Sequence, residues 1–333
     1  MILHGDALSI LKTLDAESVN CCVTSPPYYN LRDYGVDGQI GLEETPEEYI
    51  QRLVEIFREV RRVLKSDGTL WVNIADSYAG SGKGRVKDGV AKLETFSGMK
   101  RSNKGTILGT LTQTKSDNCK PKDQIGIPWM LAFALRADGW YLRQDIIWAK
   151  PNPMPESVKD RCTKSHEYIF LLSKSRRYYF DGEAISEPVA DSSIQRLSQN
   201  IDAQKGSDRV PFKTNGNMKA ALPRYGGKKY TENPDKFYRT KSGNAYAYRP
   251  KRNKRDVWTI TTKPFKGAHF ATFPPDLIEP CILAGCPVGG VVLDPFAGSG
   301  TTGMVAKQNK RDFILIDLNA DYVQICEERT SGK

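Results

Sequence analysis

Two short segments near opposite ends of the chain carry residue types that could do chemistry. The first, residues 24–30, reads Thr-Ser-Pro-Pro-Tyr-Tyr-Asn and follows an apolar run. Consecutive prolines fix the backbone, so the carbonyl groups of Ser25 and Pro26 should point in set directions, with the ring of Tyr28 beside them. Acceptors next to a ring suit a flat, amine-bearing guest such as a nucleobase. A strand that ends in a proline turn with a surface tyrosine is an equally good interpretation of this segment alone.

The second segment, residues 294–302, has the layout of a nucleotide cofactor loop. Asp294 ends an apolar strand pattern, and Gly298 and Gly300 then open a helix. Glycine allows close approach of the backbone to a ligand. The next strand pattern ends in Asp317, 19 positions after Gly298, which is the spacing of a carboxylate that accepts from ribose hydroxyls. A tight strand-to-helix turn is the alternative for the glycines alone.

The elements that must position both segments alternate between strand and helix patterns. Strands are expected at residues 2–4, 19–23, 69–74, 141–149, 167–172, 257–260, 291–294 and 313–317, and helices at 8–14, 46–66, 128–137, 275–284, 301–308 and from 322 onward. Thr45, Pro46 and Glu48 predict a capping box at one helix start, and residues 67–68 predict its end. This alternation predicts a largely parallel sheet covered on both faces. Such a sheet would bring both segments to the same edge.

Composition is that of a globular protein with a local charge imbalance. Hydrophobic residues make up 39% and charged residues 26% of the chain, and no apolar run reaches the length of a membrane span. The start lacks the features of a signal peptide, so we expect a cytoplasmic protein. Seven cysteines without a Cys-x-x-Cys pair predict buried thiols rather than disulfides or a metal site.

The excess of positive charge is confined to two segments. Residues 196–266 hold 18 Lys and Arg against 5 Asp and Glu, and residues 81–122 hold 10 against 3. Basic residues interleaved with aromatic ones favour a surface that faces a polyanion, with solvated basic linkers as the alternative.

The two segments together resemble the motifs of amino-group DNA methyltransferases that use S-adenosylmethionine. The catalytic motif of that family is (Ser/Asp/Asn)-Pro-Pro-Tyr, and its cofactor motif centres on Phe-x-Gly-x-Gly. The catalytic motif comes first here, with a basic region between the two, which resembles the permuted, beta-type arrangement. The resemblance implies an α/β fold with a doubly wound, mostly parallel, seven-stranded Rossmann-like sheet.

The resemblance also implies site residues, domains and partners. The catalytic residues would be Ser25, Pro26, Pro27 and Tyr28, and the cofactor residues Asp6, His269, Phe270, Phe273, Asp294, Phe296, Gly298, Gly300, Thr301 and Asp317. Residues 1–80 and 123–190 would form the catalytic half, 81–122 a basic mobile insertion, 191–255 an irregular target-recognition region and 256–333 the cofactor-binding half. The expected cofactor is S-adenosyl-L-methionine, without a metal. The expected partner is double-stranded DNA, while the presence of a cognate restriction endonuclease and the choice between monomer and homodimer are left open.

Serine at the first motif position is commonest, by resemblance, in enzymes that act on cytosine N4. Adenine N6 is the main alternative, followed by an amide N-methyltransferase of RNA or protein and by a DNA-binding protein without catalysis. Carbon-5 cytosine methylation would need a Pro-Cys nucleophile, but Pro280-Cys281 falls in a predicted helix and is expected in the core. Two features stay open: Asp76 could face the cleft or cap a helix, and residues 150–153 could bound a base pocket or form a rigid surface loop.

Overall fold

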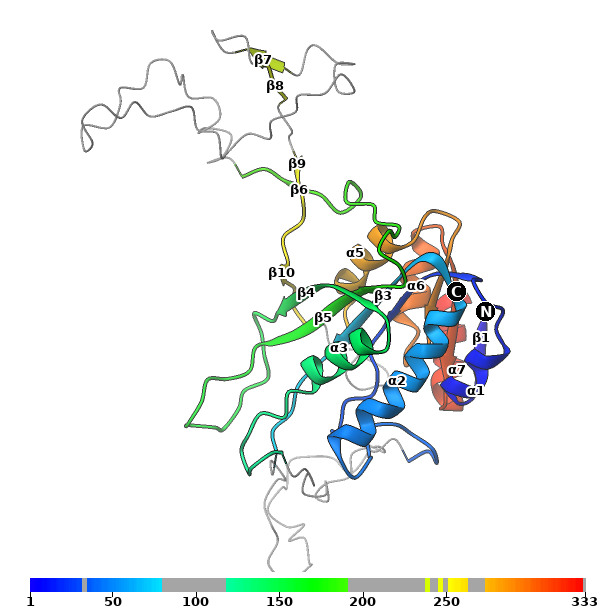
Figure 1. Ribbon diagram of the computed structural model, residues 1–333, viewed down its shortest axis with the longest axis vertical. Helices are drawn as coiled ribbons and strands as arrows, with labels where there is room; N and C mark the ends of the chain where they lie inside the picture. The colour runs from blue at the N-terminus through cyan, green and yellow to red at the C-terminus, as the bar shows by residue number, and fades with distance from the viewer. Residues whose placement is uncertain are drawn as a thin grey trace, which may run out of the picture. The chain divides into compact units, whose positions relative to one another are not determined.

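The computed structural model describes residues 1–31, 35–79, 118–190, 237–239, 245–247, 251–262 and 273–331. Its contacts divide the chain into two units. The first comprises Met1–Ala184 and Arg255–Lys333, and the second Ile185–Lys254. The first unit contains the sheet and all of the helices described below (Figure 1).

The first unit is built on an eight-stranded sheet of order β1-β12-β11-β2-β3-β5-β4-β10. Its strands are β1 (Ile2–His4), β2 (Val19–Thr24), β3 (Leu64–Ile74), β4 (Tyr141–Ala149), β5 (His166–Ser173), β10 (Val257–Thr259), β11 (Val291–Asp294) and β12 (Asp312–Asp317). Every neighbouring pair is parallel except the two that involve β5, which runs antiparallel to both β3 and β4. The mostly parallel α/β fold is therefore confirmed. The expected number of seven strands is wrong, because β10 pairs with β4 and adds an eighth.

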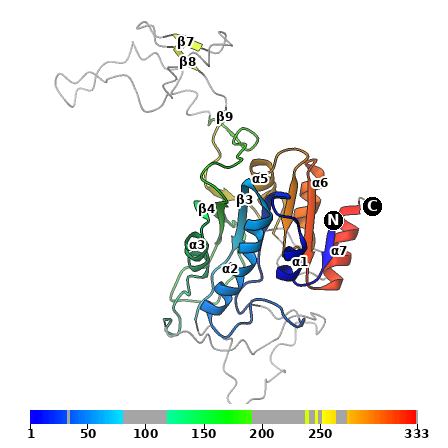
Figure 2. The ribbon, with the colours of Figure 1, turned by 45° about the vertical axis from the view of Figure 1, so that its right-hand side comes forward.

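Helices cover both faces of this sheet (Figures 1 and 2). They are α1 (Ala7–Thr13), α2 (Pro46–Val63), α3 (Ile127–Ala137), α5 (Pro275–Gly285), α6 (Thr301–Gln308) and α7 (Ala320–Ser331). Helix α2 contacts α1 and α3 on one face, and α6 contacts α5 and α7 on the other. The main apolar core lies between the sheet and the first three helices, with Tyr49 and Phe57 of α2 fully buried in it. In the part of the chain that the structure describes, none of these helices has the length and apolarity to cross a membrane.

Local signals explain where the helices on the first face begin. Thr45 and Glu48 form the predicted capping box of α2. The carboxylate of Asp76 accepts hydrogen bonds from the backbone N–H groups of Gly126 and Ile127 at 2.9 and 3.0 Å, so it caps α3. Of the two interpretations of Asp76, helix capping is the one that these contacts support.

Two expectations about this unit need correction. Helix α2 ends at Val63 rather than before residues 67–68, because Leu64 already begins β3. All seven cysteines are free, as expected, but Cys119 is half-buried and Cys162 is exposed. Cys281 is buried inside α5, as expected for a core residue, while Pro280 is half-buried.

The second unit contains two short antiparallel strand pairs within its described residues. Strands β6 (Glu187–Pro188) and β9 (Lys251–Arg252) pair with each other, as do β7 (Phe237–Arg239) and β8 (Ala245–Ala247). Residues 191–236 of the expected target-recognition region, and residues 81–117 of the expected insertion, lie outside the described residues.

Candidate active site

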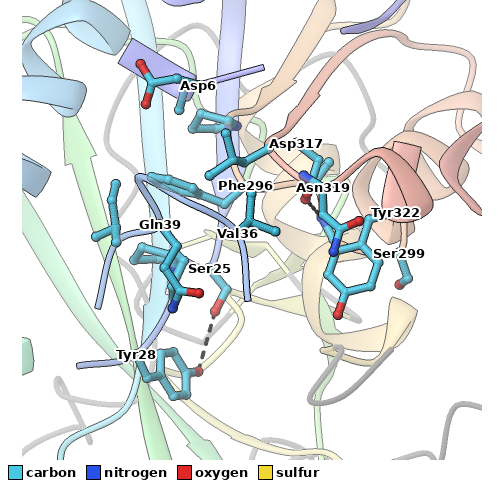
Figure 3. A pocket seen from close by; sticks show the side chains of 18 of the residues that line it. Asp6, Ser25, Tyr28, Val36, Gln39, Phe296, Ser299, Asp317, Asn319 and Tyr322 are labelled. Carbon is cyan, nitrogen blue, oxygen red and sulfur yellow. Dashed lines mark hydrogen bonds between the residues drawn. The ribbon is translucent and has the colours of Figure 1, made fainter. Parts of the chain in front are cut away.

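The carboxyl ends of β2, β11 and β12 meet at one edge of the sheet, since these strands are parallel neighbours. A cavity opens there, with a volume of about 1130 Å³ that includes space open to solvent. It is lined by both predicted segments, with Ser25 and Tyr28 on one side and Phe296 and Asp317 on the other (Figure 3). The fold thus brings together residues that stand at opposite ends of the sequence.

Hydrogen bonds fix the Ser25–Tyr28 segment at the end of β2. The Thr24 hydroxyl donates to the Asp294 carboxylate at 2.6 Å, which ties this strand end to the glycine-rich loop that follows β11. The Tyr49 hydroxyl of α2 donates to the Pro27 carbonyl at 2.7 Å. Gly41 has φ +100°, and a Cβ there would lie 3.0 Å from the Tyr28 carbonyl oxygen. The proline segment is therefore held from both sides, as a rigid set of acceptors requires.

The Tyr28 side chain lines the cavity with its ring, while its hydroxyl is buried behind it. That hydroxyl donates to Glu167 Oε2 at 2.8 Å and lies 3.3 Å from Asn73 Oδ1. Burial, followed by the charge of Glu167, raises the pKa of Tyr28 well above its ordinary value, so the phenol keeps its proton. Tyr28 is half-buried and hydrogen-bonded, so its interpretation as a surface tyrosine is wrong.

Asp294 is buried beside the glycine-rich loop and does not line the cavity. Its carboxylate is fully buried and accepts from the hydroxyls of Thr24 and Thr302, each at 2.6 Å, and from the Phe296 N–H at 3.1 Å. Burial raises its pKa to about 6 against these three stabilising donors. These bonds join β2, the loop and α6 through a residue outside the cavity lining.

Asp317 lines the cavity, at the end of β12. Its carboxylate accepts from the N–H groups of Gly298 at 2.7 Å and Asn319 at 2.9 Å. Gly298 has φ +52°, a left-handed conformation that turns its N–H toward that carboxylate. Burial raises the pKa of Asp317 to about 6. A carboxylate with remaining lone pairs at the strand end can accept from the hydroxyls of a ligand.

Gly300 and Thr301 stand where the loop meets α6, and only Thr301 lines the cavity. Gly300 is outside the cavity lining, and a Cβ there would lie 2.9 Å from Cys326 Sγ in α7. Thr301 lines the cavity, and its hydroxyl lies 3.2 Å from the Arg329 guanidinium. Arg329 also donates to the Ser299 carbonyl at 2.5 Å, so α7 holds the loop in place. Gly300 is therefore explained by helix packing, and its contact with a cofactor stays a prediction.

Of the four remaining predicted cofactor residues, the structure describes two. Asp6 and Phe273 line the cavity, and the Asp6 carboxylate also caps α1 by accepting from the Ser9 N–H at 2.9 Å. His269 and Phe270 lie outside the described residues. Among the residues that the structure does describe, no group of three His, Cys, Asp or Glu side chains could hold a metal ion.

Sequence reasoning missed Glu167, which lies behind Tyr28, and singled out its partner Lys150 only as part of the 150–153 segment. Glu167 lies in β5 with 9% of its surface exposed, and its Oε1 forms an ion pair with the Lys150 ammonium. The signal available in the sequence was an acidic residue inside an otherwise apolar strand pattern, since such residues are rarely buried without a partner. Further lining residues were also missed, namely Val36, Asn319 and Tyr322, whereas Gln39 lines the cavity as part of a loop expected at the mouth of the site.

Comparison with known proteins gives consistent matches over nearly the whole chain. A family model described as DNA methylase matches residues 19–328. The Type II methyltransferase M.Cfr9I of Citrobacter freundii is 44% identical over 333 residues, which cover 100% of this chain and 88% of the relative. The Type II methyltransferase M.SmaI of Serratia marcescens is 43% identical, covering 98% of this chain and 89% of the relative.

Among solved structures, the cytosine-N4-specific PvuII DNA methyltransferase superposes with a TM-score of 0.58. The match covers 99% of this chain and 85% of the other, at 17% sequence identity. At that identity the likeness shows a shared fold.

Proposed function

The chain belongs to the DNA methylase family, and we propose that it methylates the N4 amine of cytosine within a specific sequence of double-stranded DNA. Its methyl donor is S-adenosyl-L-methionine. One observation carries the proposal. The Ser25–Tyr28 segment lines the same cavity as Phe296 of the glycine-rich loop and Asp317 at the end of β12. The choice of cytosine rests on serine at the first position of the catalytic motif.

The side chains and backbone groups that line the cavity fit this cofactor. Asp317 offers carboxylate oxygens at a strand end, Gly298 brings backbone close to the cavity, and Phe296 offers an aromatic surface. We propose that these residues hold the cofactor, with Asp6 and Phe273 at the same cavity as further contacts. When bound, S-adenosyl-L-methionine supplies an electrophilic methyl group on a positively charged sulfur.

Ser25 and Pro26 supply the acceptors that the target amine needs. An exocyclic base amine is a poor nucleophile, because its lone pair is delocalised into the ring. If the Ser25 hydroxyl oxygen and the Pro26 carbonyl accept its two N–H hydrogens, the nitrogen becomes pyramidal and the lone pair is freed. Fixed acceptors of this kind act through position and electrostatics and require no strong base. The target base must leave the duplex to reach them, and the ring of Tyr28 offers a stacking surface there.

The second unit, Ile185–Lys254, has the composition for reading the target. We propose that this basic and aromatic segment is the target-recognition region, and that a restriction endonuclease of the same specificity accompanies the enzyme.

The test is a methylation assay with base analysis. The protein is incubated with tritiated S-adenosyl-L-methionine and mixed-sequence duplex DNA, and the DNA is then digested to nucleosides and separated. We expect label in N4-methylcytosine, and the same label appearing measurably but much more slowly with a Ser25→Ala variant. Label in N6-methyladenine would establish the adenine alternative, and DNA without label would contradict the proposed activity.

A further inference from the structure

Behind the catalytic motif lies a buried charged group that the proposed mechanism does not yet use. Glu167 Oε2 accepts from the Tyr28 hydroxyl at 2.8 Å and from Asn73 Nδ2 at 3.1 Å, while its Oε1 pairs with the Lys150 ammonium. Asn73 comes from β3, Glu167 from β5 and Lys150 from the end of β4, which are neighbours in the sheet. Because β5 runs antiparallel, its beginning lies at the edge where β3 and β4 end.

The carboxylate determines which way the hydroxyl protons point. A carboxylate can only accept, so the Tyr28 proton is directed toward Glu167. Asn73 Oδ1, the other group within reach of that hydroxyl, is also an acceptor. The Tyr28 oxygen is then left to accept, and the Ser25 hydroxyl donates to it at 3.5 Å (Figure 3). This distance is long for such a bond, which is common at catalytic groups before substrate binds.

This direction matters because a hydroxyl has a single proton. When the Ser25 proton is directed to Tyr28, both lone pairs of the Ser25 oxygen are available to a ligand. An exocyclic amine presents N–H donors, so it needs an acceptor at this point. If the chain of bonds ran the other way, the Ser25 proton would face the donors of the amine.

We infer that Glu167 is a positioning residue, which acts through Tyr28 to present the Ser25 oxygen as an acceptor to the target amine. The inference rests on the proposed amine methylation. Lys150 and Asn73 keep the carboxylate in place by occupying its other acceptor positions. The ammonium of Lys150 also lies 4.2 Å from the centre of the Trp148 ring, which fixes the cation in turn.

Glu167→Gln tests this direction, because glutamine keeps the shape of the side chain and adds N–H donors. We expect single-turnover methylation of duplex DNA to slow by about 10- to 100-fold, as for loss of a hydrogen bond to a charged group. The dissociation constant for S-adenosyl-L-methionine and the KM for DNA should stay within about 3-fold of wild type. Glu59→Gln is the matched control, since Glu59 forms an ion pair with Arg62 on α2 away from the cavity.

A double-mutant cycle with Ser25→Ala separates this role from a merely structural one. If Glu167 acts by orienting the Ser25 hydroxyl, adding Glu167→Gln to the Ser25→Ala enzyme should slow it by less than about 3-fold. The same 10- to 100-fold loss in the Ser25→Ala background would show that Glu167 acts without Ser25 and would overturn the inference.

Tyr28→Phe provides a second test of the inference if Glu167→Gln lowers the thermal unfolding midpoint. This variant removes the linking hydroxyl and leaves the ion pair of Glu167 and Lys150 intact. We expect a comparable loss of turnover with unchanged cofactor affinity, whereas wild-type turnover in Tyr28→Phe would overturn the inference. Failure of the wild-type protein to label DNA would instead contradict the proposed function, so the two failures are distinguishable.

Discussion

Two aspartates of the site have the same raised pKa but different surroundings. The pKa values of Asp294 and Asp317 both reach about 6 because burial disfavours the charged form. All three donors to Asp294 come from the protein, and it does not line the cavity. Asp317 has two backbone donors and lines the cavity, so its remaining lone pairs are available to a ligand. Protonation of Asp317 should therefore lower the affinity for the ligand.

We predict that cofactor affinity falls as the pH drops through about 6, the raised pKa of Asp317. Protonation removes acceptor capacity from Asp317, so the dissociation constant for S-adenosyl-L-methionine should rise by about 10-fold between pH 8 and pH 5. In Asp317→Asn the affinity should be weaker at pH 8 and nearly independent of pH. Isothermal titration calorimetry across this range measures both, and an equally steep pH dependence in Asp317→Asn would contradict the assignment.

Loss of stability does not explain such a pH effect. A carboxylate whose pKa is raised by folding binds its proton more tightly in the folded state. Each of these two aspartates therefore destabilises the fold above pH 6, and this cost is relieved as the pH falls from their folded pKa of about 6 toward the ordinary value of 3.8. A thermal unfolding midpoint measured alongside the titrations checks that the protein remains folded at pH 5.

At the scale of elements, the sequence predicted the bounds of helices and strands best where neighbouring residues in the chain determine them. The bounds of β4 and β11 match the expected 141–149 and 291–294, because apolar runs there are bounded by glycine and proline. The capping box of α2 was also readable from Thr45 and Glu48. The end of α2 could not be predicted from the sequence. Pairing of β3 with β2 begins at Leu64 and overrides the turn signal at Asp67.

Contacts across the sheet were the part that could not be predicted. The group of Tyr28, Glu167 and Lys150 depends on the antiparallel register of β5, in which Glu167 pairs with Trp148 of β4. That register follows from tertiary packing, so the acidic residue could be noticed in the sequence but not assigned to Tyr28. The glycine loop was predictable as a turn, but the role of α7 in shaping it was not.

We predict that Gly300→Ala destabilises the fold more than Gly289→Ala. Both glycines have positive φ, +74° and +75°, so alanine costs about 1–2 kcal/mol of backbone strain at either position. At Gly300 the new Cβ would also lie 3.0 Å from the Cys326 Cα, whereas nothing lies within 4 Å at Gly289. Overpacking should add about 1–3 kcal/mol at Gly300 alone. Equal unfolding free energies of the two variants in urea would contradict this explanation of the loop.

At the scale of the whole molecule, the positive charge is concentrated in two segments of the sequence. The net charge is +10, yet residues 196–266 alone hold 18 basic residues against 5 acidic ones, so the rest of the chain has no positive excess. A cofactor cavity needs no such concentration of charge, while the phosphates of DNA account for it. The two binding events should therefore differ in their dependence on salt.

We predict that DNA affinity falls steeply with salt and that cofactor affinity does not. Each cation that neutralises a phosphate adds about 0.9 to the slope of log K against log salt. Replacing Lys228 and Lys229 together by glutamine should lower this slope by up to about 2, measured by fluorescence anisotropy with labelled duplex. Lys65→Gln with Lys310→Gln is the control of equal charge, because both residues are exposed and lie near strand starts, at the edge of the sheet opposite the cavity. An equal loss of slope in the two double variants would mean that DNA affinity follows net charge alone, and that the basic segment is not the surface that binds it.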